Sequence, residues 1–313
     1  MSSTDSASIY LEAGKEYQLK AEYYDNRDYA IAKLQWKVPQ IGKATRLDLY
    51  GEAGKAVREC ETVVAVMGIN KSIEREGQDR YDIQLPADQR EFLQEIYKVN
   101  PNIIVVLVAG SSLAVNWMDE HVPAIVNAWY PGEQGGTAVA EVLFGDYNPA
   151  GKLPVTFYRN VSQLPDFEDY NMTGRTYRYM QDVPLFPFGY GLSYTTFGYG
   201  KTVLDKNELT AGQSLKLTVP VTNTGKRNGE EVVQVYLRKQ GDAEGPIKTL
   251  RAFKRVSIPA GKTVNVEFDL KDKELEWWDD QSNTVRVCPG NYDIMVGGSS
   301  KEEDLQRTTI AIK

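Results

Sequence analysis

Between residues 50 and 158, continuous apolar runs alternate with stretches of helical periodicity. The predicted strands are residues 62–67, 103–108 and 124–129, and the predicted helices are residues 53–60, 88–99 and 133–144. Mostly apolar runs of this length are expected of strands buried on both faces. In the middle helix the large apolar side chains share one face: Phe92, Leu93, Ile96 and Tyr97. Buried strands that alternate with amphipathic helices predict an α/β domain built on a parallel sheet.

The pattern changes to a period of two beyond residue 201. Apolar side chains alternate with polar ones in short stretches, namely Leu215, Leu217, Val219 and Val221, then Val233, Val235 and Leu237, then Val264, Val266 and Phe268, then Tyr292, Ile294 and Val296. Turn sequences separate these stretches: Asn223-Thr-Gly225, Pro259-Ala-Gly261 and Pro289-Gly290. Short alternating strands at this spacing predict a β-sandwich of the immunoglobulin or fibronectin type III kind.

Two further segments flank these domains. Residues 8–38 are predicted to form about three strands, because Leu34, Trp36 and Val38 alternate with polar residues and turn sequences divide the segment. Alone these strands would form only part of a β-domain. Residues 159–200 have no regular period, but their end, Phe186–Tyr194, is rich in aromatic residues. We expect this end to be ordered and packed against both neighbouring domains. The predicted divisions are residues 1–40, 50–158, 159–200 and 201–313.

Composition excludes several classes of function. The 313 residues carry a net charge of -7, and clustered positive charge of the kind that binds nucleic acid is not evident. No apolar stretch is long enough to span a bilayer. With one histidine and two distant cysteines, Cys60 and Cys288, the sequence predicts neither a multi-histidine metal site nor a disulfide framework. We therefore expect no nucleic acid, membrane, metal or cofactor among its partners.

A charged loop follows the first predicted buried strand. It contains Glu74, Glu76, Asp79 and Arg80 around Gly77. Ligand sites of parallel α/β sheets lie beyond the carboxyl ends of the strands, which favours a functional role for the loop. The competing interpretation is a solvated, salt-bridged surface loop. Two carboxylates on one mobile loop are not held at a controlled separation, so this pair alone does not make a complete glycosidase dyad.

Other candidate motifs favour structural roles. Trp129-Tyr-Pro-Gly-Glu133-Gln-Gly-Gly136 lacks the spacing of known phosphate-binding loops and is interpreted as a cap and helix start, with Glu133 in the first turn. Gly110-Ser-Ser112 does not match the nucleophile elbow of serine hydrolases. His121, the only possible histidine base, is expected near a surface turn before Pro123.

Several long motifs, in order, resemble the C-terminal half of glycoside hydrolase family 3. They are Glu76-Gly-Gln-Asp79-Arg80 with Leu85-Pro86 and Gln89, Ala128-Trp-Tyr-Pro-Gly-Glu133, Gly145-Asp-Tyr-Asn-Pro-Ala-Gly151-Lys-Leu-Pro154 and Phe186-Pro-Phe-Gly-Tyr-Gly-Leu-Ser-Tyr-Thr195. The resemblance covers about residues 50–313 and is strongest to bacterial β-glucosidases and β-xylosidases. Residues 8–38 look like the end of a protective-antigen-type β-domain, which some members carry as an insertion.

The resemblance implies a retaining exo-β-glycosidase that uses no cofactor. An Asp nucleophile would lie on an N-terminal barrel, and a Glu from a loop of the α/β domain would act as acid/base. Glu76, directly before Gly77, best matches that Glu, and Glu74 is the alternate. Substrates would be β-glucoside or β-xyloside oligosaccharides. We expect both loop carboxylates to be exposed in this chain, with Glu74 nearer the loop apex and available to pair with an arginine.

The sequence begins with Met-Ser-Ser-Thr-Asp, which has no signal-peptide pattern and runs directly into strand-like sequence. This suggests a fragment that lacks the barrel, and a fragment with half of an active site is expected to be inactive. The family implies a periplasmic or secreted enzyme of carbohydrate catabolism, but the sequence itself leaves localisation open. A non-catalytic carbohydrate-binding or assembly module is the alternative function.

Overall fold

The computed structural model describes residues 9, 12, 14–18, 20 and 46–313. The chain divides into two compact units, Met1–Thr45 and Arg46–Lys313. The partial β-domain predicted for residues 1–40 lies outside the described residues, apart from a few isolated positions. The second unit contains both of the other predicted domains and the segment between them.

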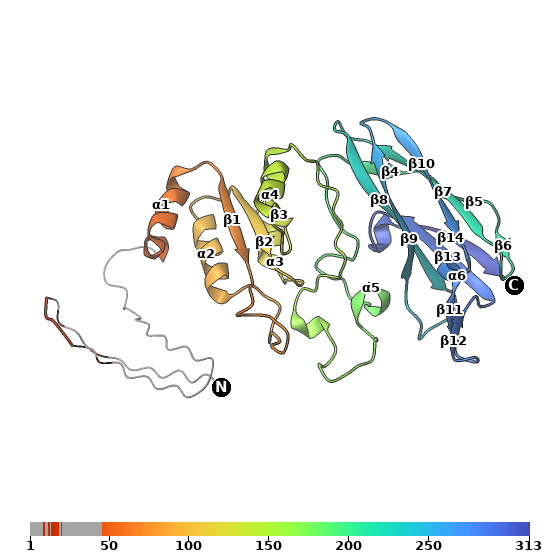
Figure 1. Ribbon diagram of the computed structural model, residues 1–313, viewed down its shortest axis with the longest axis horizontal. Helices are drawn as coiled ribbons and strands as arrows, with labels where there is room; N and C mark the ends of the chain where they lie inside the picture. The colour runs from red at the N-terminus through yellow and green to blue at the C-terminus, as the bar shows by residue number, and fades with distance from the viewer. Residues whose placement is uncertain (1–8, 10–11, 13, 19, 21–45) are drawn as a thin grey trace. The chain divides into compact units, whose positions relative to one another are not determined.

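The first part of this unit is a parallel sheet with helices between its strands. In chain order the elements are η1 (Arg46–Tyr50), α1 (Glu52–Glu59), β1 (Val63–Gly68), α2 (Ala87–Tyr97), β2 (Ile103–Val108), α3 (Asn116–His121), β3 (Ala124–Asn127) and α4 (Gly135–Phe144). The strands pair in the order β1-β2-β3, all parallel, with Val63 opposite Ile103 and Ile104 opposite Ala124 (Figure 1). The predicted α/β domain with a parallel sheet is confirmed.

The core of the α/β part is formed by α2 and the central strand β2. Leu93 and Ile96 of α2 and Ile103 of β2 are fully buried. Phe92 and Tyr97, the other members of the predicted apolar face, are half-buried and pack against the same core. The ring of Tyr97 also meets that of Trp117 edge-on at 5.3 Å. The helical periodicity thus identified the side chains that hold α2 on the sheet.

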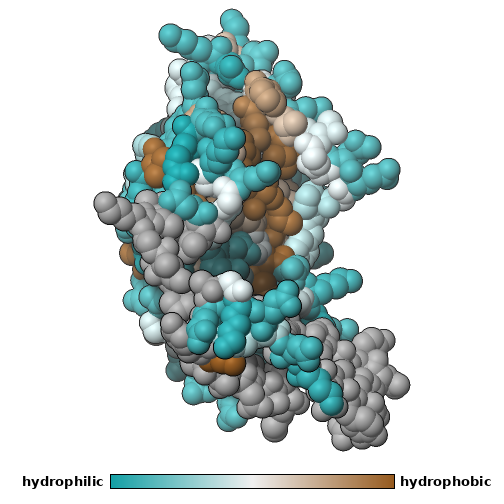
Figure 2. Space-filling model, turned by 90° about the vertical axis from the view of Figure 1, so that its left-hand side faces the viewer, coloured by the Kyte–Doolittle hydropathy of each residue, from teal (hydrophilic) through white to brown (hydrophobic). Residues whose placement is uncertain are grey.

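Strand β1 differs from the prediction, which had it buried on both faces. Its side chains alternate instead: Ala65 and Met67 are buried, whereas Val64 and Val66 are 47% and 66% exposed. Successive side chains of a strand point to opposite faces of the sheet, and only the face with Ala65 and Met67 packs into the core of the described residues. An apolar band is visible on the side of the molecule where β1 lies (Figure 2). An apolar run predicts a buried strand, but it cannot show which side the surrounding elements cover.

Two helix predictions also need correction. Helix α4 begins at Gly135, so Glu133 lies outside it rather than in its first turn. The amide of Gly135 donates to the carbonyl of Gly132 at 2.9 Å. Because this turn occupies residues 132–135, the helix begins after Glu133. Helix α3 was not predicted. It ends at His121, which is exposed just ahead of Pro123, in keeping with its expected surface position.

The C-terminal part is a two-sheet β-sandwich, as predicted. One sheet has the order β10-β7-β4, with β5 also on β7, and the other has the order β6-β14-β13-β8-β9, beside a β11-β12 hairpin. The strands are β4 (Phe197–Tyr199), β5 (Val203–Leu204), β6 (Glu208–Leu209), β7 (Leu215–Asn223), β8 (Gly229–Lys239), β9 (Thr249–Ile258), β10 (Thr263–Leu270), β11 (Trp277–Asp279), β12 (Thr284–Arg286), β13 (Gly290–Gly297) and β14 (Gln306–Ile312). The short α6 (Asp272–Leu275) and η3 (Glu302–Asp304) connect them. The alternating side chains of β7 and β8 form the core.

The segment between the two parts is ordered and hydrogen-bonded to both. Besides η2 (Val161–Gln163) and α5 (Thr176–Tyr179), it has little regular structure. The amide of Gly189 donates to the carbonyl of Leu153 at 2.8 Å, while its own carbonyl accepts from Gln234 of β8 at 3.1 Å. A Cβ on Gly189 would lie 2.0 Å from the Gln234 side chain, so only glycine allows this approach.

The predicted packing of Phe186–Tyr194 is therefore confirmed for most of its length. The ring of Phe186 stacks on that of Tyr190 at 5.4 Å and contacts Phe157 at 6.1 Å. Two residues depart from the expectation, because Leu192 is 73% exposed and Tyr194 is 45% exposed.

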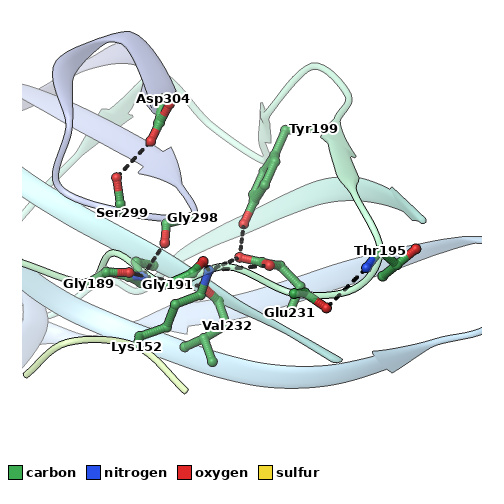
Figure 3. A network of polar contacts seen from close by, with 12 residues as sticks. Lys152, Gly189, Gly191, Thr195, Tyr199, Glu231, Val232, Gly298, Ser299 and Asp304 are labelled. Atoms are coloured by element: carbon green, nitrogen blue, oxygen red, sulfur yellow. Dashed lines mark hydrogen bonds and ion pairs between the residues drawn. The ribbon is translucent and has the colours of Figure 1, made fainter. Parts of the chain in front are cut away.

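A buried ion pair joins this segment to the sandwich. The Lys152 ammonium lies 3.2 Å from a carboxylate oxygen of Glu231 on β8, and the two side chains are 15% and 6% exposed. The same oxygen accepts a hydrogen bond from the Tyr199 hydroxyl at 3.1 Å, and Lys152 also donates to the carbonyl of Gly191 (Figure 3). Burial raises the pKa of Glu231 above its ordinary 4.5, although Lys152 and Tyr199 oppose that shift.

The raised pKa predicts a pH dependence of stability. Above pH 4.5 the unfolded Glu231 loses its proton while the folded one keeps it, so the free energy of unfolding should fall as the pH rises through this window. Urea unfolding at a series of pH values should show this slope, and Glu231→Gln should remove it. As a control, Glu303→Gln should keep the slope, because Glu303 is 74% exposed. A Glu231→Gln profile parallel to that of the unmodified chain would contradict the prediction.

Candidate active site

Three loops meet at the carboxyl edge of the parallel sheet. They follow β1 (residues 69–86), β2 (residues 109–115) and β3 (residues 128–134). Because the strands are parallel, their carboxyl ends lie at one edge, where ligand sites of such sheets form. The charged loop predicted to be functional is the first of these three.

Glu76 occupies the tip of a tight turn in that loop. The backbones of Arg75 and Gln78 exchange hydrogen bonds of 3.3 and 3.0 Å, which leaves Glu76 and Gly77 as the two central residues. Gly77 has φ of 72°, as the third position of a type II turn requires. Glu76 is exposed, as expected, and among the described residues its carboxylate contacts no partner. The turn therefore presents one free carboxylate on a defined backbone.

Glu74 has a different environment, at the base of the turn. A carboxylate oxygen of Glu74 lies 2.6 Å from Nε of Arg80, and the Ser111 hydroxyl is 2.7 and 2.9 Å from its two oxygens. Its side chain is 28% exposed. The expected pairing of Glu74 with an arginine is present. The expectations that Glu74 is exposed and nearer the apex are wrong, because the bond between Arg75 and Gln78 makes Glu76 the apex.

Arg80 connects the first loop to the second. Its Nη2 donates to the Ser111 hydroxyl at 2.9 Å and to the carbonyl of Ser112 at 3.2 Å. The Arg80 side chain is 10% exposed, and its Nη1 is buried with no partner within the described part of the chain. Because one guanidinium holds Glu74 and the loop after β2 together, it anchors the turn that carries Glu76.

Asn70 organises the start of the same loop, and sequence reasoning missed it. Its carbonyl accepts from the amides of Ile73 and Glu74 at 2.9 and 3.1 Å. Its side-chain oxygen accepts from the amide of Ser72 at 2.9 Å and from the Ser72 hydroxyl at 2.6 Å. An asparagine directly after a buried strand is a typical local turn former, so its position was a usable signal. The loop is held by its own hydrogen bonds, which removes the objection that it cannot fix a carboxylate.

The third loop closes against the first two. The Tyr130 hydroxyl donates to the carbonyl of Ile69 at 3.3 Å. A Cβ on Gly110 would lie 2.5 Å from the Tyr130 ring, so the loop after β2 needs glycine here. Trp129 has a positive φ of 55°, and its ring packs edge-on against Phe157 at 6.1 Å. Glu133 is exposed beyond this turn.

The remaining candidate groups take structural positions. His121 stacks on Trp117 at 4.6 Å, and its Nδ1 lies 2.8 Å from the carbonyl of that residue. Cys60 and Cys288 are both free thiols. In the part of the chain that the structure describes, no group of three His, Cys, Asp or Glu side chains could hold a metal ion. Among the same residues, no helix has the length and apolarity to cross a membrane.

Comparison with known protein families identifies the domains that carry this arrangement of loops. The family model of the glycosyl hydrolase family 3 C-terminal domain matches residues 10–194, which include the loop with Glu74 and Glu76. The chain belongs to glycoside hydrolase family 3. A second model, the fibronectin type III-like domain, matches residues 231–300 in the sandwich.

Curated relatives are glycosidases much longer than this chain. A xylan 1,4-beta-xylosidase of Xylanibacter ruminicola is 48% identical over 97% of the chain, and the match covers 36% of that protein. A beta-xylosidase of Formosa agariphila is 41% identical over 95% of the chain and 44% of its own length. The family 3 chain thus spans well under half of each of these relatives.

Solved structures agree with the fold. A β-glucosidase from Erythrobacter marinus superposes with a TM-score of 0.76 at 38% identity, over 85% of this chain and 36% of that one. The β-glucosidase of Listeria innocua in complex with glucose gives a TM-score of 0.72 at 30% identity, over 86% and 39%. The resemblance to family 3 drawn from the motifs is confirmed, together with the fold class.

The anchoring role of Arg80 predicts a local change in stability. Arg80→Met leaves the half-buried Glu74 carboxylate without its cation, which should cost roughly 1–3 kcal/mol in loop opening. The amides of Glu74 and Gln78 should then exchange with solvent about 5- to 150-fold faster in hydrogen-exchange measurements. Lys98→Met is the matched control. Lys98 pairs with Glu95 at 2.7 Å but is 65% exposed, so removing that pair should change exchange little. Equal effects of the two substitutions would contradict the anchoring role.

Proposed function

We propose that this chain is the C-terminal part of a retaining, exo-acting β-glycosidase that removes terminal β-D-glucosyl or β-D-xylosyl residues from non-reducing ends. Family membership supports glycoside hydrolysis in general. The finer specificity rests on the names of the relatives, which are β-xylosidases and β-glucosidases. The observation that carries the proposal is the turn that presents the Glu76 carboxylate at the carboxyl edge of the sheet.

Glu76 is proposed as the acid/base of the reaction. A general acid must reach the leaving-group oxygen, and an exposed carboxylate at a turn apex can do so, whereas both oxygens of Glu74 already have partners. Gly77 beside it lacks a side chain, so a sugar can approach the backbone closely. Glu76 would protonate the departing oxygen and afterwards take a proton from the attacking water.

The nucleophile of the proposed enzyme lies outside this chain. Retaining enzymes hold their two carboxyl groups about 5–5.5 Å apart, and the second carboxylate attacks the sugar. Glu74 is a poor candidate for it, because it is bound to Arg80 and lies beneath the same turn. An Asp on an N-terminal barrel, the arrangement implied by the sequence resemblance, would supply the attack. The chemistry requires no metal or organic cofactor.

Because the proposed nucleophile lies outside this chain, we predict that the chain alone does not hydrolyse glycosides. Purified chain incubated with aryl β-glucosides and β-xylosides should show no turnover, because protonation without a nucleophile does not break the bond. Turnover near the rate of ordinary enzymes, roughly 1 per second or more, would contradict the division. Titration calorimetry with the corresponding oligosaccharides tests the alternative function. Tight binding without turnover, even when the missing part is supplied, would favour a carbohydrate-binding module.

The roles of the two glutamates can be separated in a chimera, defined as the Xylanibacter ruminicola relative with its matching segment replaced by this chain. Glu76→Ala should lower kcat by about 10²–10⁴ on xylo-oligosaccharides, whose leaving groups need protonation. It should spare the first step on activated aryl glycosides, and added azide should restore their turnover. Glu74→Ala is the control, and its effect should not be reversed by azide. If Glu74→Ala alone shows azide rescue, the assignment is wrong by two residues while the glycosidase proposal stands.

A further inference from the structure

Helix α5 lies beside the first residues of β9, and two arginines come together there (Figure 1). The amide of Ile247 donates to the carbonyl of Arg178 at 2.7 Å, and the amide of Leu250 donates to the Tyr177 hydroxyl at 3.1 Å. These bonds bring Arg178 of α5 close to Arg251 of β9. Both arginines are half-buried, and neither belongs to the loops of the candidate active site.

A β-bulge sets the position of Arg251. Tyr236 of β8 pairs with Leu250, but Val235 pairs with Ala252, so Arg251 is an additional residue with no opposite partner. Bulges change the direction of a side chain relative to the regular alternation of the strand, and they are common beside functional sites. The bulge therefore gives a reason why an arginine at this position need not follow the pattern of β9.

The two guanidinium groups contact aromatic rings and lack an anionic partner. Cζ of Arg178 lies 5.5 Å from the centre of the Tyr179 ring, and Cζ of Arg251 lies 5.7 Å from that of the Trp277 ring. Arg251 donates from Nη2 to the carbonyl of Glu276. The Arg178 guanidinium makes no hydrogen bond or ion pair within the described part of the chain. The rings contact both cations but accept none of their remaining N–H groups in the way that an oxygen would.

Three buried polar atoms without a hydrogen-bond partner gather at this point. They are Nε of Arg178, Nε of Arg251 and the hydroxyl of Thr249, and they make up half of the six such side-chain atoms among the described residues. A buried donor without an acceptor is unfavourable, and two of these donors carry charge. The pKa of Arg251 is lowered, first by burial and then by the charge of Arg178. The two cations are thus close enough to repel each other.

The acidic side chains nearby do not balance these charges. The Asp242 carboxylate accepts from Nε1 of Trp277 at 2.6 Å and from the amide of Gly245 at 2.8 Å. Glu276 raises the pKa of Arg251, but by less than Arg178 lowers it. Where the structure describes the chain, Glu276 forms no ion pair with either arginine. The cluster therefore has donors and positive charge but no anion.

We propose that Arg178, Thr249 and Arg251 form a binding site for an oxyanion, the chemistry that a carboxylate and a phosphate group share. Guanidinium groups form charge-assisted hydrogen bonds with such oxygens, and the Thr249 hydroxyl can donate to the same anion. An anion between the two arginines would give all three orphan atoms a partner and offset the repulsion. Its source is either a solute or an acidic side chain from the part of the longer relatives that this chain does not span. The inference does not depend on the glycosidase proposal.

Thermal unfolding of the full chain tests the site, with inorganic phosphate as the probe. Replacing chloride by phosphate at equal pH and ionic strength should raise the melting temperature at least about 2 °C more for the unmodified chain than for Arg178→Met. The difference between variants is the measure, because phosphate also stabilises folded proteins through exclusion from their surface. Arg227→Met is the matched control. Arg227 also lies over a ring, that of Tyr194 at 5.7 Å, but it is exposed, so this variant should respond to phosphate as the unmodified chain does.

The melting temperature in chloride separates anion binding from a purely structural role. In chloride the Arg178→Met substitution should not lower it, because the substitution removes a repulsive charge and an orphan donor while it keeps an unbranched side chain. If Arg178 only held α5 on β9, the substitution would lower the melting temperature by the same amount in chloride and in phosphate. That equal loss, or an equal rise of both proteins in phosphate, would overturn the proposal.

The chimera with the Xylanibacter ruminicola relative distinguishes the two sources of the anion. If a solute occupies the site, the phosphate effect and its loss in Arg178→Met should persist in the chimera. If an acidic side chain occupies it, the phosphate effect should vanish, and Arg178→Met should lower the melting temperature of the chimera by about 2 °C or more in chloride. Either result supports the oxyanion site. A chimera that responds neither to phosphate nor to Arg178→Met would overturn it, because the site would then have no occupant in the assembled protein.

Discussion

The parallel pairing of β1 with β2 is the constraint on which the candidate site depends. With Val63 opposite Ile103, both strands end at the same edge, and the loops after them must meet there. Arg80 can therefore reach Ser111 and Ser112 while its Nε holds Glu74. A slip between the strands would separate these groups, and the turn that carries Glu76 would lose its support. The placement of the proposed acid/base thus derives from backbone pairing in the core.

The connection to the sandwich uses buried polar contacts as well as aromatic packing. The Lys152–Glu231 pair and the Tyr199 hydroxyl form a set of directional contacts at the junction, and Gly189 allows Gln234 to approach the backbone. Buried ion pairs add little net stability, but they disfavour other arrangements, because separating the charges would leave them unpaired. This explains how a segment with little regular structure can join the two parts in an ordered way.

Local sequence patterns determined much of this protein. Periodicity located β1, α2 and β2 and the strands of the sandwich, because burial imposes a period on the side chains of each element. The order of motifs identified the family, and the position of the charged loop after a buried strand identified the candidate site. The sequence also limited the acid/base candidates to Glu74 and Glu76.

Only the tertiary structure decided how those two glutamates differ. They are two positions apart, and the sequence analysis, which anticipated an arginine partner for Glu74, placed Glu74 rather than Glu76 nearer the apex. The exposure of Val64 and Val66 was likewise hidden, because an apolar run has the same composition whether or not another element covers it. The sequence pattern shows whether each position along the chain is apolar, polar or charged. Contacts between loops and the burial of one face of a strand depend on segments that are far apart in the sequence. Only the folded structure brings those segments together.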